Sequence, residues 1–419
     1  MTAGMALIIV IVIVVVFSGF GSLVWYAFRF EVANFQLSNN NIYLKSERDS
    51  GNPDKISSIK AENIAGSKAP LKILHLSDFH LRDDFKSRKL ANFIKTLSFD
   101  SYDFIFITGD MVEKDGLQNK LIETLKPLKA KYGVYAVFGA HDYFNKKPSE
   151  FIKNMFKKKE SYSRKNDVAG LRRKLESIGI KVLQNESLIL KGVAGYDEID
   201  IVGVDDPLIN KMDLKKSLSG IFQNDEDIKI INISAKDLPL KDLNIMTNYE
   251  DKELKNDNKL SNISQPYGKP TDITDTENIS ENMEIKNREN QYLINASGIK
   301  KTKEYKEAFG LSLNKYHSLG ESKKLKIALI HTPDSYALVN LALNGIDIVF
   351  AGHTHGGQVR VPAIGAIISG CNLKTKYAAG LFYFKDFVLQ VSKGLGEGRF
   401  SRFRIYCDPE AIITTIKEV

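Results

Sequence analysis

The segment LKILHLSDFH, residues 71–80, joins a strand-like apolar run to two side chains of the types that bind metal ions. The run Leu71–Leu76 is short and mostly apolar, which predicts a buried β-strand. Asp78 and His80 follow it at once. Because residues two apart in an extended chain point to the same side, we expect these side chains to converge on one ligand.

The same kind of apolar run recurs along the chain. Similar short runs, rich in Ile, Val and Phe, are found at residues 103–108, 134–138, 199–204, 325–330, 346–351 and 387–391. Helical patterns at residues 87–97 and 118–129 separate the early ones. Strands that alternate with helices predict an α/β fold built in layers.

Several of these predicted strands end in acidic or histidine residues. They are Asp110 in FIFITGD, His141 and Asp142 in FGAHD, His331 in ALIHTPD, and His353 and His355 in VFAGHTHGG. In open α/β sheets, ligands bind beyond the carboxyl ends of the strands, so these groups are expected to meet there. A mixture of carboxylates and imidazoles suits manganese, iron or zinc. His75 lies inside a strand and is interpreted as a packed, hydrogen-bonded histidine.

In this order, the motifs D-x-H, G-D, G-x-H-D, H and G-H-T-H resemble the signature of the calcineurin-like metallophosphoesterases. The resemblance runs from about residue 71 to the C-terminus. The segments GHTHGGQVRVP and GLGEGRFSRFRIYCDPE resemble the membrane-anchored bacterial members of that family. The resemblance implies a four-layer αββα sandwich that holds two divalent metal ions, with manganese favoured and iron or zinc as alternatives.

The resemblance also assigns roles to the residues that match the motifs. It implies that Asp78, His80 and His355 bind the first metal, that Asp110 bridges both metals, that His331 and His353 bind the second, and that His141 protonates the leaving oxygen while Asp142 holds its imidazole. Two such ions suit an in-line displacement at phosphorus.

Ala140 departs from the family pattern, in which an asparagine ligand of the second metal stands before the histidine. A methyl group cannot coordinate a metal ion. We therefore expect a weakened second site with water in the vacant position, and Asn145 is a possible substitute ligand. The implied function is a membrane-anchored phosphoesterase that hydrolyses a phosphodiester or pyrophosphate bond, with a lipid-linked substrate such as UDP-2,3-diacylglucosamine as one candidate. The alternative is a degenerate metal-binding scaffold with weak or no turnover.

The N-terminus predicts a membrane anchor. Residues 6–28 form an uncharged and mostly apolar run, and this run is long enough to cross a bilayer. The flanking positive charges are Arg29, Lys45, Arg48, Lys55 and Lys60. They all follow the apolar run, so the positive-inside rule places the catalytic domain in the cytoplasm, with a single pass through the cell membrane. A cleaved signal peptide is the alternative, although no basic region precedes the run.

The remaining regions are assigned by composition. We predict an anchor at 1–30, a polar connector at 31–70, and the metallophosphoesterase domain at 71–419 with a polar, low-complexity insertion at about 241–303. A basic amphipathic stretch surrounds Phe151, Ile152, Met155 and Phe156. Contact with membrane lipid and packing on the core explain this pattern about equally well, and the nearby predicted active site tilts the choice slightly toward lipid. No nucleic-acid-binding motif accompanies it, so no nucleic-acid partner is expected.

Overall fold

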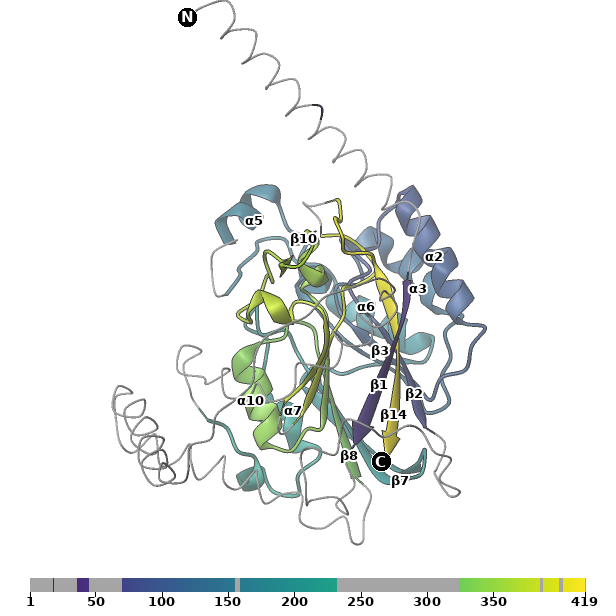
Figure 1. Cartoon of the computed structure of the whole chain (residues 1–419), viewed down its shortest axis with the longest axis vertical. Coiled ribbons are helices and arrows are strands. Elements are labelled where there is room, and N and C mark those ends of the chain that lie inside the picture. The colour runs from purple at the N-terminus through teal and green to yellow at the C-terminus, as the bar shows by residue number, and fades with distance from the viewer. Residues whose placement is uncertain are drawn as a thin grey trace, which may run out of the picture.

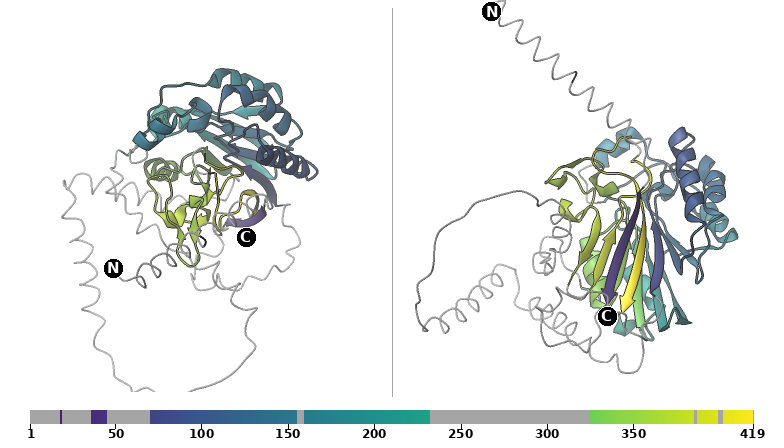
Figure 2. Two further views of the ribbon diagram at one scale, coloured as in Figure 1. Left: turned by 90° about the horizontal axis from the view of Figure 1, so that it is seen from above. Right: turned by 45° about the vertical axis from the view of Figure 1, so that its right-hand side comes forward.

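Two mixed β-sheets packed face to face, with helices on their outer faces, form the body of the protein (Figures 1 and 2). The computed structural model describes residue 18 and residues 36–44, 70–154, 159–231, 324–384, 387–398 and 402–418. This arrangement matches the four layers of helices and sheets expected from the sequence.

The first sheet is built largely from the first half of the domain. Its strand order is β1 (Gln36–Leu44), β14 (Glu410–Glu418), β2 (Leu71–Leu76), β3 (Phe104–Thr108), β4 (Val134–Val137) and β5 (Ile180–Val182). Strands β2 to β5 run parallel, whereas β14 is antiparallel to β2. The helices α2 (Phe85–Leu97), α3 (Gln118–Leu125) and α6 (Val168–Ser177) contribute Leu90, Leu121 and Leu171 to the apolar cluster on this side of the sheet.

The second sheet has a parallel centre and antiparallel edges. Its strand order is β12 (Gly380–Tyr383), β13 (Val388–Val391), β9 (Ile348–Ala351), β8 (Lys324–Ile330), β7 (Tyr196–Val204) and β6 (Glu186–Val193). The helices α7 (Leu214–Ser219) and α10 (Ser335–Leu343) pack on it. Shorter elements are η3 (Asp115–Leu117), α4 (Ala140–Tyr143), α5 (Pro148–Asn154), η4 (Asp225–Asp227), η5 (His355–Gly357), β10 (Arg360–Val361), β11 (Gly365–Ala366) and η6 (Thr375–Tyr377).

Aromatic side chains fill the space between the two sheets. Phe106 from β3 packs edge to face on Phe350 from β9, with 5.1 Å between ring centroids, and both are fully buried. Strands that are buried on both faces read as continuous apolar runs, which is why the sequence pattern located β3, β8 and β9. This core aligns the parallel strands of both sheets, so the loops that follow them meet at one end of the molecule.

The connector predicted at residues 31–70 contains a strand. Strand β1 pairs in parallel with β14 from Gln36 opposite Glu410 to Leu44 opposite Glu418. Its sequence, QLSNNNIYL, lacks the apolar alternation that marks a half-buried strand. The pairing depends on backbone hydrogen bonds to a strand more than 360 residues away in sequence, which no local pattern reveals.

Two other predictions fall on parts of the chain beyond the described ranges. Apart from residue 18, the predicted anchor at 6–28 lies outside the described residues, and so does the predicted insertion at 241–303. Among the residues that the structure describes, no helix has both the length and the hydropathy needed to cross a bilayer.

His75 is a packed, hydrogen-bonded histidine, as the sequence predicted. Its Nε2 lies 2.8 Å from Thr108 Oγ1 and its Nδ1 lies 3.0 Å from Gln390 Nε2. The side chain is fully buried between the sheets, and this burial lowers its pKa to about 3. The folded protein therefore keeps His75 neutral under conditions in which the unfolded chain takes up a proton.

Replacing His75 with Gln is expected to reduce the acid sensitivity of the fold. Since the folded pKa is depressed, the contribution of His75 is fully present above about pH 6.5 and is lost as the pH falls toward 3. The difference in unfolding free energy between pH ~7 and pH ~4.5 should shrink by roughly 1–3 kcal/mol in His75→Gln. Urea titrations of metal-chelated protein at both pH values measure this, and equal differences in both proteins would refute the prediction.

Candidate metal centre

In the loops that follow the parallel strands, the predicted metal ligands have a left-handed backbone conformation that is uncommon for residues other than glycine. Five predicted metal ligands have positive φ angles, namely Asp78, His80, Asp110, His353 and His355. Such conformations cost on the order of 1–3 kcal/mol each and gather at functional sites. Asp78 and His80 thus converge through left-handed turns, and the extended geometry predicted for them is wrong. Their backbone N–H groups donate to the carbonyls of Gly109 and Asp110, which joins the loops after β2 and β3.

The residues predicted for the first metal lie together. His80 Nε2 is 3.0 Å from His355 Nε2 and 4.0 Å from Asp78 Oδ1. His355 Nε2 is in turn 3.6 Å from the same Asp78 oxygen. All three side chains are buried, and they come from the loops after β2 and β9. The three possible ligand atoms lie within 4.8 Å of one another.

Asp110 stands between this group and His331. Its Oδ2 lies 3.5 Å from His80 Nε2 and 3.2 Å from His331 Nε2. Its Oδ1 accepts a hydrogen bond of 2.8 Å from the backbone N–H of His141. Burial opposes ionisation of Asp110, but the imidazoles of His331 and His141 outweigh it and hold the pKa of this carboxyl well below its usual value. This is the position that the sequence predicted for a carboxylate bridging two ions.

The hydrogen bonds around these residues fit a bound cation. His331 Nδ1 donates to the carbonyl of Thr108 at 2.6 Å, and His80 Nδ1 donates to Glu113 Oε1 at 2.8 Å. Burial lowers the pKa of His331, but the charge of Asp110 outweighs it and holds this pKa well above its usual value. A metal ion would take the place of that proton, and the Nε2 atoms of both rings would then offer lone pairs beside Asp110. Asp78 Oδ1 and His331 Nε2 are buried without a hydrogen-bond partner. Acceptors that face acceptors in a buried site are unfavourable unless a cation lies among them.

His353 contributes to the site in a different way. Its backbone N–H donates to Asp78 Oδ2 at 2.9 Å, and its ring packs edge to face on His331 with centroids 5.3 Å apart. Its Nε2 donates to the carbonyl of Gly370 at 2.9 Å, so Nδ1 is the nitrogen that keeps a lone pair. His353 does not belong to the three groups of possible ligand atoms that gather within 4.8 Å in the described part of the chain.

The imidazole of His141 is next to Glu113 rather than Asp142. His141 Nδ1 lies 3.4 Å from Glu113 Oε2, and its ring packs edge to face on His80. The carboxylate of Asp142 instead accepts backbone N–H groups of Gly139 and Met111 at 3.0 and 2.8 Å. The role predicted for Asp142 is therefore corrected. In helix α4, consecutive side chains point in different directions, and Asp142 folds back to cap the start of the helix.

Gly139 gives Asp110 and His331 the space that they occupy. A Cβ atom at Gly139 would lie 2.3 Å from Asp110 Oδ1 and 2.6 Å from the ring of His331. No side chain fits at this distance. The glycine before Ala140 therefore brings the start of α4 directly against the centre.

Sequence reasoning missed three buried charged residues beside the site. Glu113 contacts both His80 and His141, and its signal was its place three residues after Asp110. Arg404 lies in the SRFRIYCDPE segment, and its guanidinium is 3.3 Å from His355 Nδ1. Lys146 follows α4, and its Nζ is 3.2 Å from Glu160 Oε2. Each lies among other charged residues of its loop, and only the fold shows that it is buried.

Ala140 is the first residue of α4, and Asn145 follows the end of this helix. Ala140 is fully buried at the start of α4 and offers no ligand atom. Asn145 is half-buried, and its backbone N–H donates to the carbonyl of Arg164 at 3.0 Å. The proposed substitution of Asn145 for the missing ligand stays a prediction.

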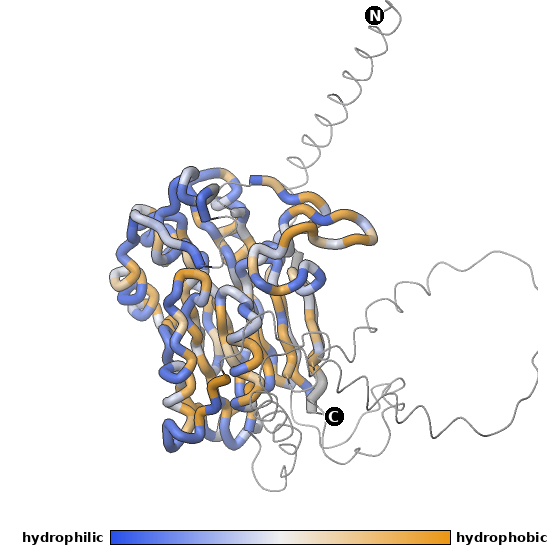
Figure 3. Tube along the Cα trace, turned by 90° about the vertical axis from the view of Figure 1, so that its left-hand side faces the viewer, coloured by the Kyte–Doolittle hydropathy of each residue, from blue (hydrophilic) through white to orange (hydrophobic). Residues whose placement is uncertain are grey.

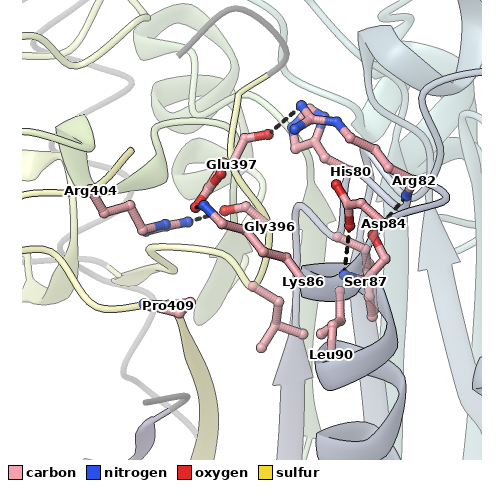
Figure 4. Close-up of a pocket in the computed structure, with 12 residues that line it drawn as sticks. His80, Arg82, Asp84, Lys86, Ser87, Leu90, Gly396, Glu397, Arg404 and Pro409 are labelled. Atoms are coloured by element: carbon pink, nitrogen blue, oxygen red, sulfur yellow. Dashed lines mark hydrogen bonds and ion pairs between the residues drawn. The ribbon is translucent and has the colours of Figure 1, made fainter. Parts of the chain in front are cut away.

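A small pocket opens behind His80 (Figure 4). Arg82, Lys86 and Arg404 line it together with apolar residues such as Leu90. Arg82 also binds Glu113 at 3.2 Å and the carbonyl of Glu397 at 3.1 Å, so it supports the carboxylate that orients His80. The cavity volume of about 40 Å³ admits water but no nucleotide or lipid.

Replacing Ala140 with Asn is expected to tighten the second metal site. An amide oxygen at this place would offer the ligand that the methyl group lacks, a gain of about 1–3 kcal/mol in binding of the weaker ion. Calorimetric titration of metal-depleted protein with manganese measures the affinities of both sites. Asn145→Ala is the matched test, since it weakens the looser ion only if Asn145 supplies a ligand. Two equally tight ions in the wild type, unchanged in Ala140→Asn, would show that another group completes the site.

Similarity to known proteins agrees with this geometry. Residues 71–240 match a family model described as calcineurin-like phosphoesterase. The uncharacterized metallophosphoesterase YkoQ of Bacillus subtilis is 31% identical over 179 residues, which cover 41% of this chain and 56% of that protein. The phosphodiesterase YaeI of Escherichia coli is 33% identical over 90 residues, which cover 22% of this chain and 32% of that protein.

A mammalian relative is also similar. A transmembrane protein with metallophosphoesterase domain from Bos taurus is 25% identical over 174 residues, which cover 39% of this chain and 35% of that protein. The matched region spans about half or less of each of these three relatives. Together with the buried carboxylates and imidazoles, these similarities support a calcineurin-like metallophosphoesterase domain in this chain.

Proposed function

We propose that the protein is a metal-dependent phosphoesterase that hydrolyses a phosphodiester or pyrophosphate bond. The observation that carries the proposal is the place of Asp110 Oδ2, within 3.5 Å of the Nε2 atoms of both His80 and His331. A carboxylate that lies between two groups of imidazole ligands suits hydrolysis by two metal ions, because the carboxylate can be shared by both ions. Asp78, His80 and His355 would hold one divalent ion, and His331 and His353 the other, with Asp110 between them.

The chain's own residues perform the remaining tasks. When bound, the ions would supply Lewis acidity at the phosphoryl oxygens. Glu113 orients His80 and stands beside His141. Burial, followed by the charge of Lys146, lowers the pKa of His141 to about 4, while Glu113 and Asp110 oppose this shift. The negative charge of a bound phosphoryl group would raise this pKa and prepare His141 to protonate the leaving oxygen.

The finer proposal is a lipid-linked substrate at the cell membrane. The apolar run at residues 6–28 supports an anchor, and the positive charges that follow it support a cytoplasmic catalytic domain. UDP-2,3-diacylglucosamine is a candidate, because it combines a pyrophosphate bond with acyl chains. The name of the Bos taurus relative, which describes a transmembrane protein, agrees with an anchored enzyme.

The second candidate function is a metal-binding scaffold with weak or no turnover. Ala140 favours it, because it removes a ligand that the family pattern provides. The gathered carboxylates and imidazoles favour an enzyme, because they include every other predicted ligand except His353.

Hydrolysis by the purified full chain distinguishes the two functions. We expect manganese-dependent cleavage of bis(p-nitrophenyl) phosphate that is abolished by a chelator and restored by added metal. UDP-2,3-diacylglucosamine in mixed micelles tests the lipid-linked proposal separately. Bound metal without cleavage of either substrate would favour the scaffold.

A further inference from the structure

An exposed apolar surface lies directly beside the metal centre. Six of the nine large apolar side chains that are exposed in the described part of the chain fall in two neighbouring loops, namely Val361, Ile364, Ile367, Ile368, Phe403 and Tyr406. Ile364 is 77% exposed and Ile368 is 68% exposed. Isolated exposed leucines or isoleucines are ordinary, but a cluster of this kind marks an interaction site.

The surface is built on a short hairpin. Strands β10 and β11 pair antiparallel, and Ile364 N–H donates to the carbonyl of Val361 across the turn. Ala363 at the tip has a φ of 67°, a conformation that is unfavourable for alanine. The second loop is attached to the first at a parallel bridge between Val359 and Ile405, where Ile405 N–H donates to the Gln358 carbonyl and Arg360 N–H donates to the Ile405 carbonyl. In the hydropathy view an apolar loop stands out at the end of the molecule where Figure 1 labels β10 (Figure 3).

The hairpin continues from the residues of the metal centre. His355 begins η5, and β10 starts three residues after η5 ends. A Cβ atom at Gly357 would lie 2.6 Å from Ala366 Cβ, so the hairpin packs closely on the turn that carries His355. The loop after the hairpin supplies the Gly370 carbonyl that accepts from His353. The apolar surface therefore borders the centre.

The segment that carries the hairpin has no acidic residue, and the nearest carboxylates are Asp334, which accepts from Asn372, and Asp408, which follows the second loop. The sequence from residue 359 to 384 contains no Asp or Glu. Lys374, Lys376 and Arg402 are exposed, and η6, which includes Lys376, lies against β11. An apolar surface bordered by basic side chains suits an anionic bilayer, where acyl chains lie beneath charged head groups.

We propose that the β10–β11 hairpin and residues 402–406, together the docking loops, insert into an anionic lipid bilayer and place the metal centre at the membrane surface. The occupant is the bilayer rather than a second copy of the chain, because the bordering charges complement anionic head groups and would repel their own copies. The contact also orients the domain, which an N-terminal tether alone does not do. This inference goes beyond hydrolysis, and its test needs neither metal nor turnover.

Lipid quenching of a single tryptophan tests the proposal. Trp25 is the one tryptophan of the chain, so Trp25→Phe combined with Ile364→Trp places the only indole at the hairpin tip. The matched control is Trp25→Phe with Phe99→Trp. Phe99 is 82% exposed and lies beyond the end of α2, away from the docking loops. Full-length proteins are placed in bilayer nanodiscs that contain phosphatidylglycerol with brominated acyl chains.

We expect brominated lipid to reduce the emission of the Ile364→Trp protein about twofold and to leave that of the Phe99→Trp protein unchanged. Ile367→Trp, a second site on the docking loops, should behave as Ile364→Trp does. Replacing phosphatidylglycerol with phosphatidylcholine should weaken the quenching, because the basic residues lose their partner. Absence of quenching at both hairpin sites, or equal quenching in the control, would overturn the proposal. If the tryptophans on the hairpin are not quenched and light scattering shows a dimer, the surface binds a second copy of the chain and the proposal is likewise overturned.

Discussion

Replacing Asp110 with Asn is expected to lower manganese-dependent hydrolysis roughly a thousandfold. Two bound ions contribute several kcal/mol of charge stabilisation at the reacting phosphoryl group, and each factor of ten corresponds to about 1.4 kcal/mol. Asp110 stands between His80 and His331, so loss of its charge weakens both ion sites at once. Initial rates with bis(p-nitrophenyl) phosphate, together with metal analysis of the purified variant, measure the effect.

The fold should survive this substitution. Asn has nearly the same shape as Asp, and its Oδ1 can still accept the hydrogen bond from the His141 backbone N–H. Asp200→Asn is the matched control, because Asp200 is also a buried carboxylate but lies in the middle of β7. Full activity in Asp110→Asn would contradict the shared-carboxylate mechanism, and equal losses in both variants would point to a general effect on stability.

Replacing Glu113 with Gln is expected to lower activity by about 10- to 100-fold, the usual cost of losing a carboxylate that orients a metal-binding histidine. Glu113 accepts from His80 Nδ1 at 2.8 Å and lies 3.4 Å from His141 Nδ1. Burial opposes its ionisation, but His141 and His80 outweigh it and keep its pKa well below the usual value. A neutral amide at this place loses that attraction and cannot accept from both rings.

Two measurements separate the contacts of Glu113. Weaker manganese affinity in Glu113→Gln reports on His80, whereas a shift in the pH dependence of kcat reports on His141. Glu123→Gln is the control, since Glu123 is exposed on α3. Unchanged affinity together with an unchanged pH profile would mean that Glu113 only fills space.

The sequence by itself determined the buried central strands and the chemistry that follows them. Buried parallel strands such as β3 and β8 are continuous apolar runs, and this pattern needs no tertiary information. The D-x-H spacing likewise predicted that Asp78 and His80 converge, and the structure gathers them with His355. The spacing of His353 and His355 predicted that these two share an ion, but His353 lies outside that group. These signals are local, because strand period and motif spacing are both set within about ten residues.

The tertiary structure alone decided which groups serve one another. Asp142 adjoins His141 in sequence, yet its carboxylate caps α4, whereas Glu113, 28 residues earlier, lies beside the His141 ring because β3 and β4 are neighbours in the sheet. Strand β1 was missed for the same reason, since its partner β14 is at the other end of the chain. The exposed isoleucines of the docking loops resemble core residues in sequence, and only the fold leaves them in water. Side-chain direction and burial depend on contacts between distant segments, and a local pattern does not contain them.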